Sequence, residues 1–164
     1  MMEDTNPALP RLNLPLARMR VRKTADGLQV FDPLRDKFVA LTPEEYVRQQ
    51  FTAWLRTEFG FPAPFMANEI GVTFNGTSRR CDTVIFGRDK NPKVIVEYKA
   101  PNVRITQTVF DQIVRYNHVL HADYLVVSNG METFCCRMDY QANTYHFIPR
   151  LPDYRSLHFS VGEN

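Results

Sequence analysis

Two carboxylates and one lysine are the residues in this sequence whose types and spacing suit hydrolytic chemistry. Glu97 and Lys99 alternate with apolar residues, so on a strand both side chains point to the same face. Asp82 opens an earlier apolar run, and the polar segment 87–93 between the two runs predicts a hairpin loop. A loop that closes near residues 89–91 brings Asp82 opposite the Glu97–Lys99 end by antiparallel pairing. We therefore expect the three side chains to converge at one edge of a sheet.

This grouping suits metal-assisted hydrolysis of a phosphodiester. Mg²⁺ takes one or two carboxylates and keeps several waters, so Asp82 and Glu97 are the expected ligands, with the Tyr98 carbonyl as a further donor and Mn²⁺ as the expected substitute ion. A bound ion lowers the pKa of a water and neutralises phosphate charge. We expect Lys99 to orient the attacking water or to stabilise negative charge in the transition state. A Glu-x-Lys pair is also a common solvated strand face, and that alternative stays open here.

The spacing of apolar and turn residues predicts the elements that position these side chains. A helix is expected to begin at Thr42, which is followed by proline and by Glu45 at the capping-box position, and to end near Gly60. A second helix is expected from about Thr106 to Leu120. Strands are expected at residues 18–23, 28–31, 38–41, 66–74, 81–86, 94–100, 124–128, 133–138 and 144–148.

The order of these elements predicts an α/β fold with a mixed β-sheet and flanking helices. The core order is helix, three strands, helix, strand (αβββαβ), with extra strands at both ends. We expect an N-terminal arm at residues 1–17, a single domain at 18–152 and a loose tail at 153–164.

The composition is that of a soluble globular domain. Hydrophobic residues make up 44% and charged residues 23% of the chain, the longest apolar runs are too short to span a bilayer, and the N-terminus lacks the layout of a signal peptide. Three cysteines, two of them adjacent at Cys135 and Cys136, make a poor disulfide framework. We therefore expect a cytoplasmic protein without a membrane partner.

Two other kinds of site find little support. The phosphate-binding motif Gly-x-x-x-x-Gly-Lys-Ser/Thr does not occur, so we expect no ATP site and no movement along DNA by this chain alone. His118 and His121 lie three residues apart, but no third metal ligand accompanies them. We interpret them as ordinary histidines near a helix end.

Basic residues offer contacts for nucleic acid, although the formal net charge is only +2. Arg18, Arg20 and Arg22 alternate along the first expected strand, so they project from one face. Further candidates for phosphate contacts flank the later strands: Arg79, Arg80 and Arg104. The alternative is an ordinary solvated face with charged turns.

Four short motifs follow one another in a fixed order. They are Arg80-Cys81-Asp82, Val96-Glu97-Tyr98-Lys99-Ala100-Pro101, Asp111-Gln112-Ile113-Val114-Arg115-Tyr116-Asn117 and Ser128-Asn129-Gly130. Together they resemble the N-terminal nuclease domain of type I restriction-enzyme R subunits, which belongs to the PD-(D/E)XK superfamily. The run 41–49 and the turn at 59–62 are similar to small stand-alone bacterial proteins built on that domain. The resemblance covers roughly residues 20–150.

The resemblance implies a restriction-endonuclease-like fold and gives roles to matching positions. Asp82, Glu97 and Lys99 match the catalytic Asp, Glu and Lys of the family. Gln112 and Tyr116 match its Gln-x-x-x-Tyr motif, and they lie four residues apart on one expected helical face. We therefore include both in the expected catalytic set.

One position departs from the family pattern and one acidic position is undecided. Cys81 stands where the superfamily name has proline, at a position that varies in such proteins. A further acidic residue often completes these sites. Glu69 is the candidate for an additional metal ligand, whereas Glu45, the other acidic candidate, has a structural explanation as the glutamate of a capping box.

The sequence thus predicts a metal-dependent endonuclease that acts on DNA in restriction or DNA processing, with a protein partner that supplies targeting. One alternative is a non-cleaving nucleic-acid-binding or assembly module of the same fold. Another is a nuclease for RNA or branched DNA. The complete Asp-Glu-Lys set favours cleavage, because a pure binding module does not need all three residues.

Overall fold

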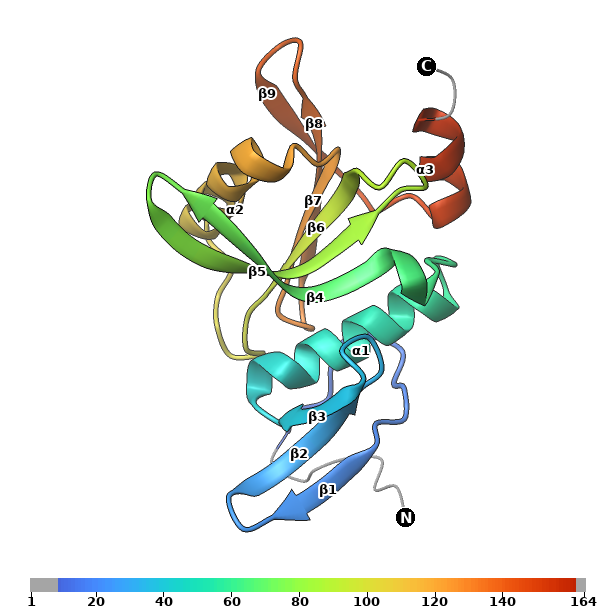
Figure 1. Ribbon diagram of the computed structural model, residues 1–164, viewed down its shortest axis with the longest axis vertical. Helices are drawn as coiled ribbons and strands as arrows, with labels where there is room; N and C mark the ends of the chain where they lie inside the picture. The colour runs from blue at the N-terminus through green and yellow to red at the C-terminus, as the bar shows by residue number, and fades with distance from the viewer. Residues whose placement is uncertain (1–8, 162–164) are drawn as a thin grey trace.

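One helix lies between two sheets in the computed structural model, which describes residues 9–161 (Figure 1). The small sheet has the order β1 (Val21–Thr24), β2 (Gly27–Asp32) and β3 (Lys37–Ala40). The large sheet has the order β4 (Met66–Phe74), β5 (Thr77–Phe86), β6 (Pro92–Tyr98), β7 (Tyr124–Ser128), β8 (Thr133–Asp139) and β9 (Thr144–Ile148). The helices are α1 (Pro43–Thr57), the short 3-10 helix η1 (Ala63–Phe65), α2 (Gln107–Leu120) and α3 (Tyr154–Val161).

The predicted core order is confirmed as α1-β4-β5-β6-α2-β7. The small sheet precedes this core, and β8 and β9 extend the large sheet after it. β6 and β7 run parallel with α2 as the crossover between them, whereas the other neighbouring strands of the large sheet run antiparallel. The large sheet is therefore mixed, as the α/β prediction requires.

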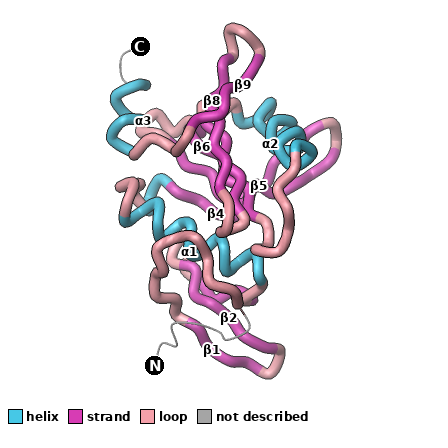
Figure 2. The backbone as a smooth tube through the Cα atoms, turned by 180° about the vertical axis from the view of Figure 1, so that it is seen from behind, coloured by secondary structure: helices cyan, strands magenta, loops and turns pink. Residues whose placement is uncertain are grey.

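The large sheet separates two hydrophobic cores. In the first core, Phe51 of α1 contacts Tyr98 of β6 with ring centroids 5.7 Å apart. In the second core, Ile113 of α2 packs with Val84 of β5 and Ile95 of β6. In Figure 2 strands β4 to β6 run between α1 and α2. Alternate residues of β6 therefore face different helices.

The first half of α1 is buried on nearly all sides, although its sequence predicts a single apolar stripe. Val30 of the small sheet joins the same core as Val47 of α1, so the small sheet covers a helix face that would otherwise meet solvent. Glu45, Arg48 and Gln50 are consequently buried. Buried polar groups need partners inside the protein, and these three find them.

The expected loose tail at 153–164 is wrong over its described part, because α3 forms there. The Tyr154 N–H donates to the Phe59 carbonyl oxygen (2.8 Å), and Leu157 is buried in the first core. A helix this short depends on such packing rather than on its own propensity. Residues 162–164 lie outside the described residues.

The expected N-terminal arm is irregular but partly buried. Residues 9–17 form neither helix nor strand, and Leu12 and Leu14 are buried in the first core. Residues 1–8 lie outside the described part of the chain. The first strand begins at Val21, three residues later than expected from the alternation that starts at Arg18.

The three cysteines are buried free thiols, as their spacing predicts. Burial raises the pKa of both Cys135 and Cys136 to about 11, so these thiols stay protonated at neutral pH. Among the helices of residues 9–161, none combines the length and the apolar character that crossing a bilayer requires.

Candidate functional site

β5 parts from β6 at Asp82, where the sequence places the site. The two strands pair as far as Thr83, which lies opposite Val96, and this is the register that the predicted hairpin requires. Asp82 does not continue the ladder; its Oδ2 instead accepts a hydrogen bond from the Tyr98 N–H (2.8 Å). A side chain therefore takes the place of a backbone partner and holds Asp82 at the Glu97–Lys99 end of β6.

β4 is distorted at the same level of the sheet. The ladder between β4 and β5 is regular on both sides of Glu69 and Asp82, but these two residues, which stand opposite each other, are not paired. Glu69 has a left-handed backbone with φ 62°, a conformation that costs a residue other than glycine about 1–3 kcal/mol. Because the strands are distorted and unpaired here, the Glu69 and Asp82 side chains need not follow the regular alternation of side chains between the two faces of the sheet.

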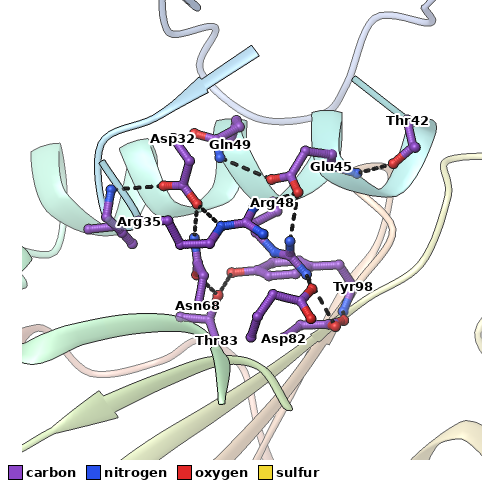
Figure 3. A network of polar contacts seen from close by, with 12 residues as sticks. Asp32, Arg35, Thr42, Glu45, Arg48, Gln49, Asn68, Asp82, Thr83 and Tyr98 are labelled. Carbon is purple, nitrogen blue, oxygen red and sulfur yellow. Dashed lines mark hydrogen bonds and ion pairs between the residues drawn. The ribbon is translucent and has the colours of Figure 1, made fainter. Parts of the chain in front are cut away.

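A buried guanidinium gathers the carboxylates at this point. Nη2 of Arg48 lies 2.5 Å from Glu69 Oε1 and 3.3 Å from Asp82 Oδ1. Its Nη1 lies 2.7 Å from Oε1 of Glu45, in the preceding turn of α1 (Figure 3). The Arg48 side chain is only 7% exposed, so water screens these attractions little. One cation from α1 thus compensates carboxylates from α1, β4 and β5.

The ion pairs form part of a closed polar circuit that reaches the small sheet (Figure 3). Arg35 bridges Glu45 (2.6 Å from Nη2 to Oε1) and the fully buried Asp32. Asp32 also accepts a hydrogen bond from Asn68 Nδ2 (2.9 Å). The circuit runs through Asp82, Arg48, Glu45, Arg35, Asp32, Asn68, Thr83 and Tyr98. It therefore connects the end of β2 to the carboxylate that the sequence marks as catalytic.

The capping-box explanation of Glu45 is wrong for its carboxylate. Thr42 Oγ1 does accept a hydrogen bond from the Glu45 N–H (3.0 Å), so the predicted N-cap is confirmed. The Glu45 carboxylate, however, binds Arg35, Arg48 and Gln49 instead of returning to the Thr42 N–H. Burial of α1 explains the difference, because the charged group must stay near cations inside the protein.

Glu97 and Lys99 lie side by side at the end of β6, although the strand ends at Tyr98 and Lys99 follows it, two residues short of the end expected from the sequence. Lys99 Nζ lies 4.0 Å from Glu97 Oε1, with the two side chains 26% and 18% exposed. The Lys99 N–H donates to the Ser128 carbonyl oxygen (2.9 Å), so the backbone at this position stays beside the end of β7. The backbone at Lys99 is therefore supported by β7, while both charged side chains are only partly exposed.

Negative charge is concentrated around Asp82. Burial raises the pKa of its carboxyl; the Tyr98 N–H and Arg48 oppose this shift, whereas Glu69 and Glu44 reinforce it, and the net direction is upward. Burial together with the Glu97 and Asp82 charges also raises the pKa of the neighbouring Cys81 thiol to about 12. A further cation near these carboxylates would reduce the repulsion between their negative charges.

The donor chemistry of these carboxylates suits a hard divalent cation. Asp82, Glu97 and Glu69 offer carboxylate oxygens, which Mg²⁺ and Mn²⁺ prefer. Within residues 9–161, no group of three or more His, Cys, Asp or Glu side chains is arranged to hold one ion. Mg²⁺ needs only one or two carboxylates in addition to its waters, so Asp82 and Glu97 are enough in number.

The two α2 residues of the expected catalytic set have different environments. Tyr116 is buried in the second core, which also contains Cys81 next to Asp82. Gln112 is half-buried one turn earlier on the same helix. Tyr116 and Cys81 thus belong to the same core on the α2 side of the sheet, and a catalytic role for Gln112 or Tyr116 stays a prediction.

The basic residues expected to bind nucleic acid fall into separate groups. Arg20 and Arg22 lie on the outer face of the small sheet, preceded by the exposed Arg18. Arg80, 72% exposed, places Nη1 3.9 Å from Glu69 Oε2, and Arg104 is exposed in the loop between β6 and α2. The remaining candidate, at position 79, has a side chain outside the described part of the structure. The described candidates are thus divided between the small sheet and the large sheet with its following loop.

Arg48, Arg35 and Asp32 have no place in the site predicted from the sequence, yet they hold it together. The spacing Glu45-x-x-Arg48 is a usable signal, because residues three apart lie on one helical face. Asp32 gives no comparable signal, since Asp before proline is an ordinary turn pattern. Only the packing of the small sheet on α1 brings these groups together.

Comparisons with known proteins identify the family and the fold. A family model described as the N-terminus of the type I restriction enzyme R protein matches residues 43–152. The fold is similar to a solved fragment assigned to the HsdR subunit of a type I restriction enzyme from Vibrio vulnificus YJ016, with a TM-score of 0.53 and 20% identity. That similarity covers 74% of this chain and 25% of the other, so this chain spans about a quarter of the solved fragment. No curated protein matches the sequence.

Proposed function

Because this chain belongs to the family of type I restriction enzyme R protein N-termini, we propose that it is a metal-dependent endonuclease domain that hydrolyses phosphodiester bonds in DNA. Membership of the family implies a nuclease-like role in restriction; the metal dependence and the site residues are the proposal. One observation carries it: β5 parts from β6 at Asp82, which sets a carboxylate at the Glu97–Lys99 end of β6.

In this proposal Asp82 and Glu97 hold a Mg²⁺ or Mn²⁺ ion, with Glu69 as a further ligand. When bound, such an ion supplies a water of lowered pKa and neutralises charge on the phosphate. The Tyr98 N–H and the Arg48 guanidinium each contact one oxygen of Asp82, so the orientation of this carboxylate is set before substrate arrives. Arg48 acts as a positioning residue, because it reaches the reacting groups only through the carboxylates.

Lys99 supplies positive charge from the chain itself. Its ammonium donates a hydrogen bond to the attacking water or to a phosphate oxygen, where negative charge grows in the transition state. Glu97 Oε1 lies 4.0 Å from this ammonium and helps to hold it in place. Gln112 and Tyr116 are assigned orienting roles from the α2 side on the strength of their motif positions alone.

The proposed partners are DNA and a protein that supplies targeting. DNA contacts are assigned to six basic side chains, Arg18, Arg20, Arg22, Arg79, Arg80 and Arg104. The protein partner follows from the family, whose name refers to one part of an R protein in a restriction enzyme.

A non-cleaving module of the same fold is the second candidate, and one observation favours it. Arg48 already supplies positive charge to Glu69 and Asp82, so the acidic cluster is stable without a metal ion. In that case the circuit would serve folding alone.

Cleavage assays separate the two candidates. Purified protein is incubated with plasmid, single-stranded DNA, branched DNA and RNA, in Mg²⁺, Mn²⁺ or EDTA. The proposal predicts DNA cleavage with either metal and none in EDTA. Cleavage of RNA or branched DNA alone would mean that the nuclease acts on that substrate instead of ordinary DNA. Absence of cleavage with every substrate and metal would favour the binding module.

A further inference from the structure

The outer face of the small sheet carries two guanidinium groups laid on phenyl rings. Arg22 lies over Phe38 with 3.8 Å from Cζ to the ring centroid, and Arg20 lies 5.2 Å from the centroids of both Phe31 and Phe38. The two rings pack edge to face, 5.3 Å apart. We call these four residues, together with Gln29, the arginine–phenylalanine face.

Strand register places these residues on one side of the small sheet. Arg22 pairs with Gln29 across β1 and β2, and Phe31 pairs with Phe38 across β2 and β3. The alternate residues, such as Val30, face α1 and the first core. The arginine–phenylalanine face is therefore the side turned away from the first core, where the half-buried phenyl rings pack against each other and beneath the arginines.

Both guanidinium groups lie over phenyl rings, but neither forms an ion pair with a carboxylate within the described structure. Arg22 Nε donates to Gln29 Oε1 (2.8 Å), and both arginines are exposed. Among residues 9–161, the ion pairs involve other cations, so neither Arg20 nor Arg22 is neutralised by a described carboxylate. An immobilised, uncompensated planar cation suits a ligand that carries both negative charge and flat rings.

We propose that the arginine–phenylalanine face binds an unpaired nucleic-acid strand, with bases stacked on the guanidinium planes and phosphates bound by their N–H groups. A flat sheet surface with aromatic and arginine side chains stacks splayed bases, which a paired duplex does not offer. The choice of nucleic acid as the ligand class rests on the proposed function, whereas the stacking geometry does not.

Side-chain contacts connect the small sheet to α1, which carries Glu45 and Arg48 beside the candidate site. Gln50 of α1 forms two hydrogen bonds with the Ala17 backbone, just before Arg18, and the Asp32–Arg35–Glu45 contacts tie β2 to α1. The family match begins at residue 43, after the small sheet. The face therefore lies outside the region that the family model matches, and its contacts with α1 fix its position relative to the candidate site.

Binding measured in EDTA tests this proposal without cleavage. A labelled oligonucleotide, single-stranded or in duplex form, is titrated with wild type and with three double variants: Arg20→Ala/Arg22→Ala, Arg20→Lys/Arg22→Lys and Lys23→Gln/Lys37→Gln. The lysine pair is a matched control, because both side chains are exposed on the same sheet at alternate positions to the face. Thermal unfolding of each variant establishes that it is folded.

The lysine replacements keep the charge and remove the plane, so they should weaken single-strand binding about five- to tenfold while leaving the salt dependence unchanged. The alanine replacements should weaken it further and lower the salt slope by about two. The control should change affinity by about twofold at most. Single-strand binding by Arg20→Lys/Arg22→Lys that equals wild type would overturn the proposal, as would equal losses in the alanine and control variants. A wild-type protein that binds single strands in this way but cleaves no nucleic acid with Mg²⁺ or Mn²⁺ would instead refute only the proposed function.

Discussion

Arginines occupy two opposite environments in this protein. Arg48 is buried on α1, where Glu45, Glu69 and Asp82 share its charge. Arg20 and Arg22 are exposed on the small sheet, where phenyl rings hold the guanidinium planes and no described carboxylate neutralises them. The same functional group is thus internally compensated in one region and available to a ligand in the other.

Burial determines which of these roles an arginine takes. A guanidinium out of water needs nearby anions, and its removal leaves those anions uncompensated. An exposed guanidinium is hydrated, so its loss costs the fold little, while a phosphate or a base can still bind it. Substitutions in the buried circuit should therefore act on stability, and substitutions on the arginine–phenylalanine face should act on binding.

Arg48→Ala should have the largest effect on stability. It leaves three carboxylates without their shared cation, and we expect the free energy of unfolding to fall by about 3–5 kcal/mol. Denaturant unfolding in EDTA measures the change. Arg56→Ala, in the last turn of the same helix, is the control and should cost about 1 kcal/mol or less. A similar small cost for Arg48→Ala would contradict the buried role.

Asp32→Asn should have an intermediate effect that depends on pH. Burial alone would raise the pKa of Asp32, but hydrogen bonds from Asn68, Arg35 and the Leu34 N–H outweigh it and lower the pKa. A lowered pKa stabilises the fold above the unfolded-state value and loses that contribution as pH falls through the folded-state value. Asp32→Asn should thus cost about 1–3 kcal/mol at neutral pH.

The cost of Asp32→Asn should shrink as pH falls from the ordinary pKa of an aspartate to the lowered pKa of folded Asp32. The unfolded wild-type chain takes up a proton first, and below the folded-state pKa the folded protein has lost the charge as well. Unfolding curves from neutral to acidic pH test this, with Asp26→Asn in the exposed β1–β2 turn as the control. A cost that stays constant over the whole range would show that the charge of Asp32 is not what connects the two sheets.

Phe38→Leu should have the smallest effect on stability. The ring supports two exposed arginines from the solvent side of the sheet, so we expect a loss of about 0.5–1 kcal/mol. Val39→Ala, on the opposite side of the same strand, should cost more because it faces the first core. If Phe38→Leu proved the more destabilising of the two, the outer face would be structural rather than a binding surface.

The position of Asp82 at the Glu97–Lys99 end of β6 could be predicted because its signals are local. The alternation of residues 94–100 and the polar turn fix which face Glu97 and Lys99 share, and the hairpin length fixes that Asp82 stands at the same end. The order of core elements was accessible for the same reason, since each helix and strand carries its own period and its own turn residues.

The supporting circuit could not be predicted because it depends on contacts between distant segments. Arg48 is buried only when the small sheet covers α1, and Glu69 turns into a left-handed conformation only where two strands stop pairing. α3 similarly depends on Leu157 reaching the first core. Local periods carry no information about such long-range packing.

The most direct test of the account is the rate of DNA cleavage by Lys99→Ala in saturating Mg²⁺. If Lys99 stabilises the transition state as proposed, the substitution removes that charge and leaves the carboxylates in place, so the rate should fall by about 10²–10³, with DNA binding and thermal stability near wild type. Lys37 is an exposed lysine distant in sequence from Asp82, Glu97 and Lys99, so the Lys37→Ala variant should cleave like wild type. Undiminished cleavage by Lys99→Ala would show that the active site lies elsewhere.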